Sequence, residues 1–367
     1  MQKNTKHVKY CLLGYGYASL VAYHKLALTH KKEDILILKN KTSSSIFTIE
    51  HNGEDFSPLP IYPVEESTLY SSSLFKSIPK QDPIKVSFSP LENFNLNNIK
   101  ASKDSLASFM INKQGIDRNL CLGLKQWGKS MLQQPLSQVQ YKIAKHYMSS
   151  SGNTRLGYVN GKSLYKYAVD QLNPNEWLYN SIEHIDVEKK EVHLNNSIIR
   201  YDTLLSTIPL HNLLHYCGLE QDHNTACASA LFYFFTYDSG FKENQMIYDC
   251  DYTSATTRIF SVKDNFLLAQ LGGQSRGKVT PETVKKRVEQ LVPNIIDLHF
   301  AKELFVEMAY PLETVSGVKT QQSIEIVKQN AIMPFGRFGN WEYSDLHELD
   351  WKSIDNSSST LTKAQLP

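Results

Sequence analysis

The fold is decided by residues 8–38, which read VKYCLLGYGYASLVAYHKLALTHKKEDILIL. Val8–Leu13 predicts an apolar strand, Leu20–Leu28 predicts the helix that follows it, and Ile35–Leu38 predicts a second strand. Near-continuous hydrophobicity is typical of parallel strands that are covered on both faces. The order strand, turn, helix, strand therefore predicts an α/β fold that opens with a dinucleotide-binding unit.

The turn between this strand and this helix fits the pattern GxGxxS. Gly14 makes the tight turn, Gly16 lets the backbone approach a pyrophosphate, and the amino terminus of the helix attracts that anion. Ala18 and Ser19 complete the pattern, and Ser19 takes the place of the usual third glycine. The alternative is a plain tight turn, but the strand before it and the helix after it favour a dinucleotide site.

The second strand is followed by a lysine, whereas a dinucleotide site usually has an acidic residue there to bind the ribose. Lys39 either pairs with a ribose phosphate, as in a cofactor of the NADP type, or marks a site that holds no ribose in the usual way. This position is a clear departure from the dinucleotide pattern.

The composition describes a globular protein of about two domains. The chain has 367 residues, of which 41% are hydrophobic and 21% are charged, so it can bury a core. A formal net charge of +2 gives no field that would hold nucleic acid, and no stretch approaches the roughly 18 apolar residues of a membrane span. The five cysteines are scattered without a CxxC pair, so we expect a reducing, cytoplasmic setting and no zinc site.

Two other motifs offer competing sites. Residues 272–278 read GGQSRGK and fit most of a phosphate-binding P-loop, but Val279 stands where a magnesium-binding hydroxyl is required. His211 and His215 have the spacing of a zinc-protease helix, but Asn212 replaces the glutamate that acts as general base. We interpret the first motif as a basic loop and the second as surface or capping histidines, and we predict no metal site.

Later segments predict a second, mostly antiparallel sheet. Its strands are expected at 228–237, 245–249, 257–262 and 265–271. A helix should follow, with Thr280 as its N-cap and Pro281 at its first position. Nearer the amino terminus, Asn52-Gly53 predicts the turn of a short hairpin.

Further segments carry a family resemblance. In chain order they read LGYVNGKSL (156–164), NSIEHID (180–186), YDTLLSTIPL (201–210), AYP (309–311) and GRFGNWEYSD (336–345). Together with the GxGxxS turn, this order resembles the superfamily of flavin-dependent amine oxidases and protoporphyrinogen oxidases, and most closely its UDP-galactopyranose mutase-like branch.

The resemblance implies a Rossmann-like FAD-binding domain of the GR2 type with an interleaved α+β substrate domain. The FAD-binding domain would comprise 1–64, 155–216 and 310–355, the substrate or cap domain 65–154 and 217–309, and a disordered tail 356–367. FAD is the expected cofactor, and a small molecule is the expected substrate.

The resemblance also assigns residues to the parts of FAD. Gly14, Gly16, Ala18 and Ser19 would bind the pyrophosphate, and Lys39 occupies the ribose position. Ile182 would contact the adenine edge, and Thr207 and Pro209 form the corner after a strand. Gly336, Arg337, Tyr343 and Asp345 would lie on the isoalloxazine side. An arginine and backbone amides after a glycine stabilise negative charge on a reduced flavin. No catalytic acid or base is predicted.

The predicted function is that of an FAD-dependent oxidoreductase of the amine oxidase type, acting on a small biosynthetic metabolite. Lys39 and the absence of the family's Gly-Gly pair from Lys41 to Ile46 predict that the flavin is held weakly or lost. Pro58-Leu59-Pro60 stands where mutases place Gly-Pro-His, which counts against mutase chemistry. Two alternatives stay open: a nucleotide-sugar mutase-like enzyme of polysaccharide assembly, and a flavin-free homologue that acts as a binding or scaffold protein.

Overall fold

A computed structural model gives the fold, and its contacts divide the chain into two units. The first unit comprises Met1–Pro79, Val159–Thr225 and Val318–Pro367, and the second comprises Lys80–Tyr158 and Ala226–Gly317. The structure describes residues 3–39, 49–51, 54–56, 61–64, 80–81, 85–89, 157–160, 169–170, 172, 177–179, 181–219, 227–243, 245–249, 251, 254–262, 265–311 and 318–342. Each unit is thus assembled from separate stretches of chain, while the boundaries expected from the resemblance stay a prediction.

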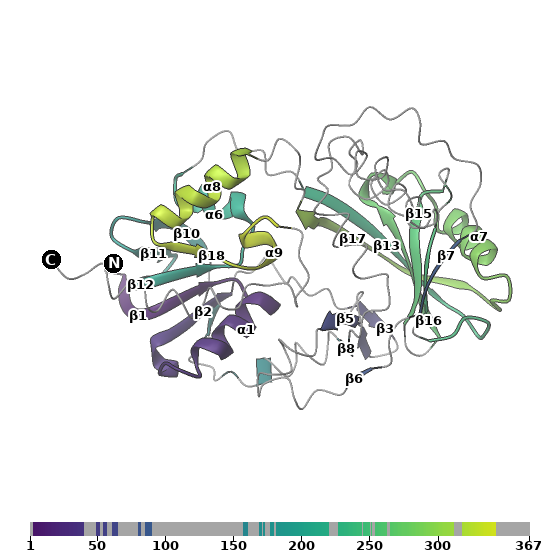
Figure 1. Ribbon diagram of the computed structural model, residues 1–367, viewed down its shortest axis with the longest axis horizontal. Helices are drawn as coiled ribbons and strands as arrows, with labels where there is room; N and C mark the ends of the chain where they lie inside the picture. Colours follow the sequence, from purple (N-terminus) through teal and green to yellow (C-terminus); the bar gives the residue numbers. More distant parts are fainter. Residues whose placement is uncertain are drawn as a thin grey trace, which may run out of the picture. The chain divides into compact units, whose positions relative to one another are not determined.

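The sheet of the first unit has parallel strands at its centre (Figure 1). β1 (Asn4–Leu13) lies between β12 (Ser197–Ser206) and β2 (Ile35–Lys39). β9 (Trp177–Tyr179) extends the sheet beyond β2, and β18 (Ile332–Pro334) pairs with the carboxyl end of β12. From β1 the chain continues to β2 on one side of the sheet, whereas from β12 it continues to β18 on the other side. The carboxyl ends of β1 and β12 therefore form a topological switch point.

An antiparallel hairpin joins the amino half of β12. β10 (Ile182–Asp186) pairs with β11 (Glu191–Leu194), and β11 pairs with β12. Lys190, in the turn before β11, has a φ of 54°, a conformation that fits a tight turn. The hairpin makes this sheet mixed, although its centre is parallel.

Helices lie on both faces of this sheet (Figure 1). α1 (Tyr17–Leu26) follows β1, and its Leu20 and Tyr23 are buried in one cluster with Leu12 and Ile37 of the sheet. Further helical segments in the described part of the first unit include η1 (Lys32–Asp34), α6 (Leu210–Tyr216), α8 (Val318–Gln329) and α9 (Gly336–Gly339). Burial on both faces explains the near-continuous hydrophobicity of β1 and β2.

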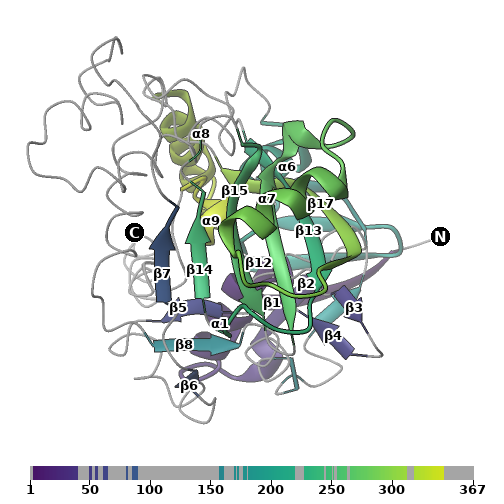
Figure 2. The same cartoon turned by 90° about the vertical axis from the view of Figure 1, so that its right-hand side faces the viewer.

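The second unit is built on a mostly antiparallel sheet in the order β17-β13-β16-β15-β14-β7. Its strands are β7 (Lys85–Phe88), β13 (Cys227–Thr236), β14 (Gln245–Tyr248), β15 (Thr256–Val262), β16 (Phe266–Gly272) and β17 (His299–Pro311). Figure 2 shows α7 (Pro281–Leu291) lying across one face of this sheet. Val284 and Val288 of α7 are buried there with Leu231 and Phe235 of β13.

The described elements also include the 3₁₀ helix η4 (Gly273–Ser275) and several short strands. β3 (Ile49–His51) and β4 (Glu54–Phe56) form an antiparallel pair, as the Asn52-Gly53 turn predicts. The other short strands are β5 (Ile61–Val64), β6 (Lys80–Gln81) and β8 (Gly157–Asn160). In the part of the chain that the structure describes, no helix is long and apolar enough to cross a membrane.

Most expectations for the secondary structure are confirmed. The α/β class holds, the four strands predicted for the second sheet are present as β13 to β16, and Thr280 caps α7 by accepting a hydrogen bond from Thr283 N–H at 3.3 Å. One expectation is wrong: α1 begins at Tyr17 and not at Leu20, because the extended Gly16 already serves as its N-cap. The expected tail and the segment Pro58-Leu59-Pro60 lie outside the described residues.

Candidate functional site

The carboxyl ends of the parallel strands meet at one edge of the sheet in the first unit. The register pairs Leu13 with both Ser206 and Leu38, and it pairs Ser206 with Pro334. Because parallel strands end at the same edge, the residues just beyond these four positions are brought together there. They include four residues that the resemblance assigns to FAD: Gly14, Lys39, Thr207 and Gly336.

Gly14 forms the turn at the end of β1. Its φ of 109° lies in the region that side chains rarely adopt. Its N–H donates to the carbonyl oxygen of Leu38 at 3.0 Å, and a Cβ at this position would overlap Oγ1 of Thr207. Thr207 in turn donates its hydroxyl to the carbonyl of Leu13 at 2.9 Å. The turn is therefore held against neighbouring backbone, and its geometry requires glycine.

α1 presents an open amino terminus directly after this turn. Gly16 is its N-cap and has no side chain to cap it, and the first turn contains no acidic residue. The N–H groups of that turn form the positive end of the helix dipole. Ser19, in the same turn, is fully buried, and its hydroxyl has no hydrogen-bond partner among the described residues. Bound water or a ligand commonly satisfies such a group.

Lys39 reaches back toward the glycine turn. Its Nζ lies 4.5 Å from the centre of the ring of Tyr15, the residue between Gly14 and Gly16. Tyr15 is buried, and burial raises the pKa of its hydroxyl, so the phenol stays neutral at pH 7. The contact is of the cation–π kind. The turn therefore has a positive charge beside it where a dinucleotide site usually has a carboxylate.

α9 begins against the first turn of α1. Gly336, its first residue, has a φ of 77°, and a Cβ there would lie 2.7 Å from the Cβ of Ala18. The preceding residue, Phe335, donates its N–H to the carbonyl of Ser206 at 2.8 Å. Arg337 is partly buried in the short helix α9. Gly336 therefore lies against Ala18 in the first turn of α1, while its role toward the isoalloxazine stays a prediction.

Ile182 is connected to this region through β9. Tyr179 pairs with Lys39, and Ile182 follows only three residues later. Three residues span at most about 11 Å, so Ile182 begins β10 within that reach of Tyr179. Its side chain is buried. The adenine role of Ile182 stays a prediction.

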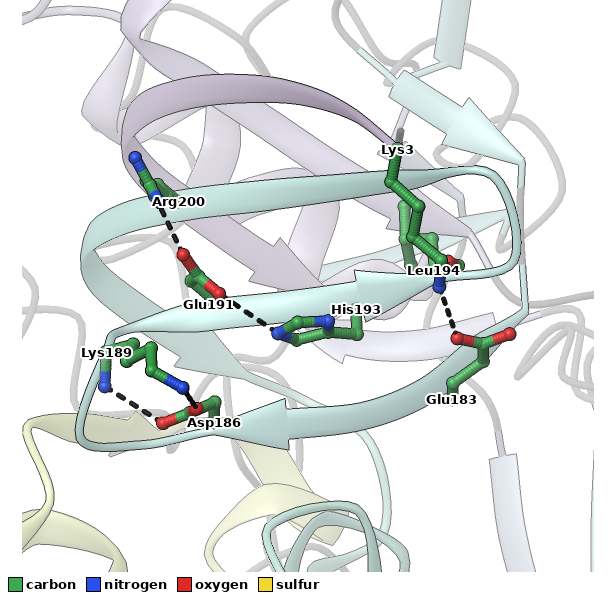
Figure 3. Close-up of polar contacts among 8 residues, drawn as sticks. All are labelled: Lys3, Glu183, Asp186, Lys189, Glu191, His193, Leu194 and Arg200. Carbon is green, nitrogen blue, oxygen red and sulfur yellow. Dashed lines mark hydrogen bonds and ion pairs between the residues drawn. The ribbon is translucent and has the colours of Figure 1, made fainter. Parts of the chain in front are cut away.

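Charged contacts hold the hairpin that contains Ile182 (Figure 3). Lys3 Nζ lies 2.6 Å from a carboxylate oxygen of Glu183, and this hydrogen bond lowers the pKa of the exposed Glu183 carboxyl. The buried Glu191 carboxylate accepts a hydrogen bond from Arg200 Nε at 2.8 Å and lies 3.0 Å from His193 Nε2. The bond from Arg200 is the main reason that the pKa of Glu191 lies below its usual value.

The corner after β12 leads into α6. Pro209 is the N-cap of α6, and His211 on its first turn makes an edge contact with the ring of Trp341, 5.4 Å between centres. Burial lowers the pKa of His211, which favours its neutral form. The described residues contain no group of three or more His, Cys, Asp or Glu side chains that could hold a metal ion. Tyr343 and Asp345 lie outside the described residues, so their roles stay predictions.

The P-loop-like segment 272–278 lies in the second unit. Its amides are used internally: Arg276 N–H donates to Gly273 O at 3.1 Å, and Lys278 N–H donates to Ser275 O at 3.0 Å. A phosphate cradle needs such amides to point at the ligand. Arg276 stacks on the ring of Phe305 at 4.3 Å. These contacts support the interpretation as a basic loop.

A polar row crosses the sheet of the second unit, and the sequence analysis did not identify it. The guanidinium of Arg258 donates to the Gln270 side chain and, at 3.4 and 3.5 Å, to the hydroxyls of Tyr248 and Tyr310. Gln270 also donates to Tyr310 at 2.9 Å. Alternation along β16 places Gln270 on the face opposite α7, because its neighbour Leu271 belongs to the core under α7.

These four residues come from β14, β15, β16 and β17, and only the register of the sheet brings them together. The signal in the sequence was the polar Gln270 within the apolar strand FLLAQLG. The row contains a cation, an amide and two phenols, which can together hold a polar or anionic group.

The residues of the first unit fit one end of a dinucleotide. The glycine turn, the open amino terminus of α1 and the buried hydroxyl of Ser19 suit a pyrophosphate. Lys39 does not supply the carboxylate that normally accepts hydrogen bonds from the ribose. The fit therefore holds at the phosphates and departs at the ribose.

Comparisons with known proteins find similar folds among solved structures. No family model matches the sequence, and no curated protein matches it. Among solved structures, reduced UDP-galactopyranose mutase is similar over 98% of this chain and 96% of that chain, with a TM-score of 0.74 and 14% identity. Wild-type putrescine oxidase bound to putrescine is similar over 97% of this chain and 100% of that chain, with a TM-score of 0.67 and 9% identity.

An oxidoreductase from Methanosarcina mazei is similar over 84% of this chain and 90% of that chain, with a TM-score of 0.59 and 11% identity. The chain therefore has the fold that UDP-galactopyranose mutase and putrescine oxidase share. The resemblance that the sequence motifs indicated is confirmed at the level of the fold.

Proposed function

We propose that the chain is an FAD-dependent oxidoreductase of the amine oxidase type, with a GR2-type dinucleotide domain, acting on a small biosynthetic metabolite. The main support for this proposal is the turn after β1, where Gly14, the uncapped start of α1 and Gly336 meet at the carboxyl ends of parallel strands. In sheets of this kind, ligands bind at that edge, at a switch point in strand order. Similarity of fold to putrescine oxidase and to an oxidoreductase supports the class of reaction.

FAD would be held mainly by backbone. The amides after Gly16 would bind the pyrophosphate, the segment at Ile182 would contact the adenine, and Gly336 with Arg337 would lie toward the isoalloxazine. When bound, the flavin supplies the acceptor for a hydride, and the protein supplies orientation and charge. The guanidinium of Arg337 would stabilise negative charge on that side.

Recognition of the substrate is assigned to the second unit. The guanidinium of Arg258, which is partly buried, lies on the sheet face opposite α7, held there by the buried Gln270 and next to the hydroxyls of Tyr248 and Tyr310. Such a set favours a substrate that carries a carboxylate, phosphate or other polar group. Arg258→Met should raise KM more than it lowers kcat if this row binds substrate without taking part in the chemical step.

The nucleotide-sugar alternative has a specific observation in its favour. Reduced UDP-galactopyranose mutase has a TM-score of 0.74 to this chain and is matched over 96% of its length. The two functions differ in their net reaction: an oxidoreductase passes two electrons from its substrate through the flavin to an acceptor such as O₂, whereas a mutase isomerises its substrate with no net oxidation. Conversion of UDP-galactopyranose to its furanose form by dithionite-reduced protein, followed by chromatography, would replace the oxidoreductase proposal.

The test of the proposed function is binding of FAD to the purified chain. Titration followed by flavin fluorescence and by the visible spectrum should give saturable binding of one FAD. Gly14→Ala should abolish it, because a Cβ would overlap Thr207. Gly218→Ala is the matched control: it also replaces a glycine of positive φ, 64°, but nothing lies within 4 Å of its new Cβ. Absence of binding by wild-type protein with a native melting transition would favour the flavin-free alternative.

A further inference from the structure

The side chain of Lys39 is directed at the phosphate end of the site. Gly14 N–H is bonded to the carbonyl of Leu38 at 3.0 Å, so Lys39 starts directly beside the glycine turn. The ammonium of Lys39 lies 4.5 Å from the ring centre of Tyr15, the residue between Gly14 and Gly16 in the sequence. A surface lysine usually extends into water. The side chain of Lys39 is instead partly buried and contacts the ring of Tyr15 in the turn.

Charge at the turn is positive from two directions. The first turn of α1 has no acidic residue and no side-chain cap, so its amides carry the positive end of the helix dipole. The ammonium of Lys39 adds a full positive charge, which contacts the ring of the neutral Tyr15. Both features favour a bound anion near the turn.

Ribose hydroxyls are poor partners for this arrangement. A carboxylate accepts hydrogen bonds from both hydroxyls of a ribose, whereas an ammonium only donates. A phosphate oxygen, in contrast, forms a charge-assisted hydrogen bond with an ammonium. We therefore propose that Lys39 is a phosphate-binding residue that contacts the pyrophosphate of the nucleotide, and that the site selects its ligand by phosphate charge and not by ribose hydroxyls.

This inference rests on the proposed function, because it assumes that a dinucleotide binds at the Gly14 turn. It adds a specific consequence: the first unit should bind ADP through its phosphates and tolerate loss of the ribose hydroxyls. Binding should also weaken with salt, because one more charge pair forms. The other source of a phosphate is the ribose itself, as in NADP, and the experiment separates the two.

Isothermal titration of the full-length chain with ADP, 2′,3′-dideoxy-ADP and adenosine tests the proposal directly. ADP and its dideoxy analogue should have Kd values within about threefold of each other, because no carboxylate reads the hydroxyls. Adenosine should show no measurable binding. Lys39→Met, which keeps the apolar stem over Tyr15, should weaken ADP binding about tenfold and flatten its salt dependence. Lys39→Arg should stay within about threefold of wild type.

Lys9 provides the matched control. Its Nζ also lies over a tyrosine ring of the first unit, at 5.6 Å from the centre of Tyr10, but it is on β1, amino-terminal to the turn. Lys9→Met should leave the Kd for ADP unchanged within about twofold. Thermal melting of both variants separates a binding effect from a folding effect.

Two results would overturn the proposal while leaving the proposed function intact: unchanged ADP binding in Lys39→Met, and tighter ADP binding in Lys39→Glu. A preference for NADP⁺ over NAD⁺ that Lys39→Met removes would overturn the proposal and would also count against FAD as the ligand of this turn. Tighter binding in Lys39→Glu would show that position 39 faces the ribose hydroxyls, and the NADP⁺ preference would place the lysine on a ribose phosphate. Wild-type protein that binds neither ADP nor FAD would overturn both this proposal and the proposed function.

Discussion

The two units of the molecule build their candidate sites by different means. In the first unit, the site consists mainly of backbone: a glycine turn, a helix amino terminus and a second glycine that lies against Ala18. In the second unit, the polar row consists of side chains on neighbouring strands, joined by hydrogen bonds among Arg258, Gln270 and Tyr310. A site made of backbone limits which side chains fit at each position, whereas a site made of side chains depends on each residue keeping its hydrogen-bond partner.

Both units bury glycines at places where a Cβ has no room, Gly14 and Gly336 in the first unit and Gly240 and Gly273 in the second. The second unit also buries Asp249 completely against the guanidinium of Arg287. Substitutions at the glycines and at this charge pair should therefore destabilise the fold for different physical reasons.

The largest expected effect is on the buried pair of the second unit. Arg287 donates to both carboxylate oxygens of Asp249, at 2.7 and 2.6 Å. Arg287→Met should lower the free energy of unfolding by about 3–5 kcal/mol, because it leaves a buried carboxylate without its partner. Lys285→Met on the same helix is the control, since its contact with Glu289 is exposed and 4.0 Å long. Urea unfolding measures both, and equal losses would contradict the side-chain account of this unit.

The next largest loss of stability is expected at Gly336 in the first unit. Gly336→Ala should cost about 1–3 kcal/mol, because a positive φ of 77° is combined with a Cβ only 2.7 Å from that of Ala18. Gly277→Ala shares a positive φ of 70°, but nothing lies within 4 Å of its Cβ. The difference between the two melting shifts isolates the close contact. If both variants melt alike, the backbone of α9 is free to move away from α1.

The sequence predicted the glycine turn between β1 and α1 for a physical reason. Gly14 and Gly16 are needed by the geometry of one continuous strand–turn–helix stretch, so their spacing is visible in a single window. Gly336 lies far along the chain and was placed only by resemblance. The structure brings it against Ala18, while the roles of Tyr343 and Asp345 stay predictions.

The polar row could not be predicted in the same way. Arg258 and Tyr310 are 52 positions apart, and they are neighbours only because β15, β16, β13 and β17 pair in a particular register. No local pattern encodes that register. The contact of Lys39 with Tyr15 was missed for a related reason: the lysine was recognised as a departure, but the direction of its side chain depends on packing beside the turn.

A smaller effect tests whether the polar row acts as a unit. Gln270 donates to the hydroxyl of Tyr310 at 2.9 Å, and both side chains are buried. Tyr310→Phe or Gln270→Leu alone should each cost about 1–2 kcal/mol, because each leaves a buried polar group without this partner. The double variant should cost less than the sum of the two. Strict additivity in urea unfolding would show that the row is a set of independent contacts.

The smallest expected effect concerns a charged side chain, Glu191, in the first unit. The pKa of Glu191 lies below its usual value, mainly because Arg200 donates a hydrogen bond to it at 2.8 Å. A carboxyl whose pKa is depressed by folding stabilises the folded state above its unfolded pKa, and that contribution is lost as the pH falls through the folded value. Glu191 should therefore support the hairpin of β10 and β11 at neutral pH, begin to lose this contribution as the pH falls below its unfolded pKa of about 4.3, and lose all of it below its lower folded pKa.

Glu191→Gln measures that contribution. The variant should be less stable than wild type at pH 7 by no more than about 1 kcal/mol, because Arg200 is largely exposed. The difference should shrink as the pH is lowered through the acid range, since wild type then loses the same charge. Glu183→Gln, an exposed carboxyl on the same hairpin, is the control for a general charge effect. Parallel stability curves for Glu191→Gln and wild type from pH 7 to pH 3 would mean that the hairpin, like the glycine turn, is held by backbone and packing alone.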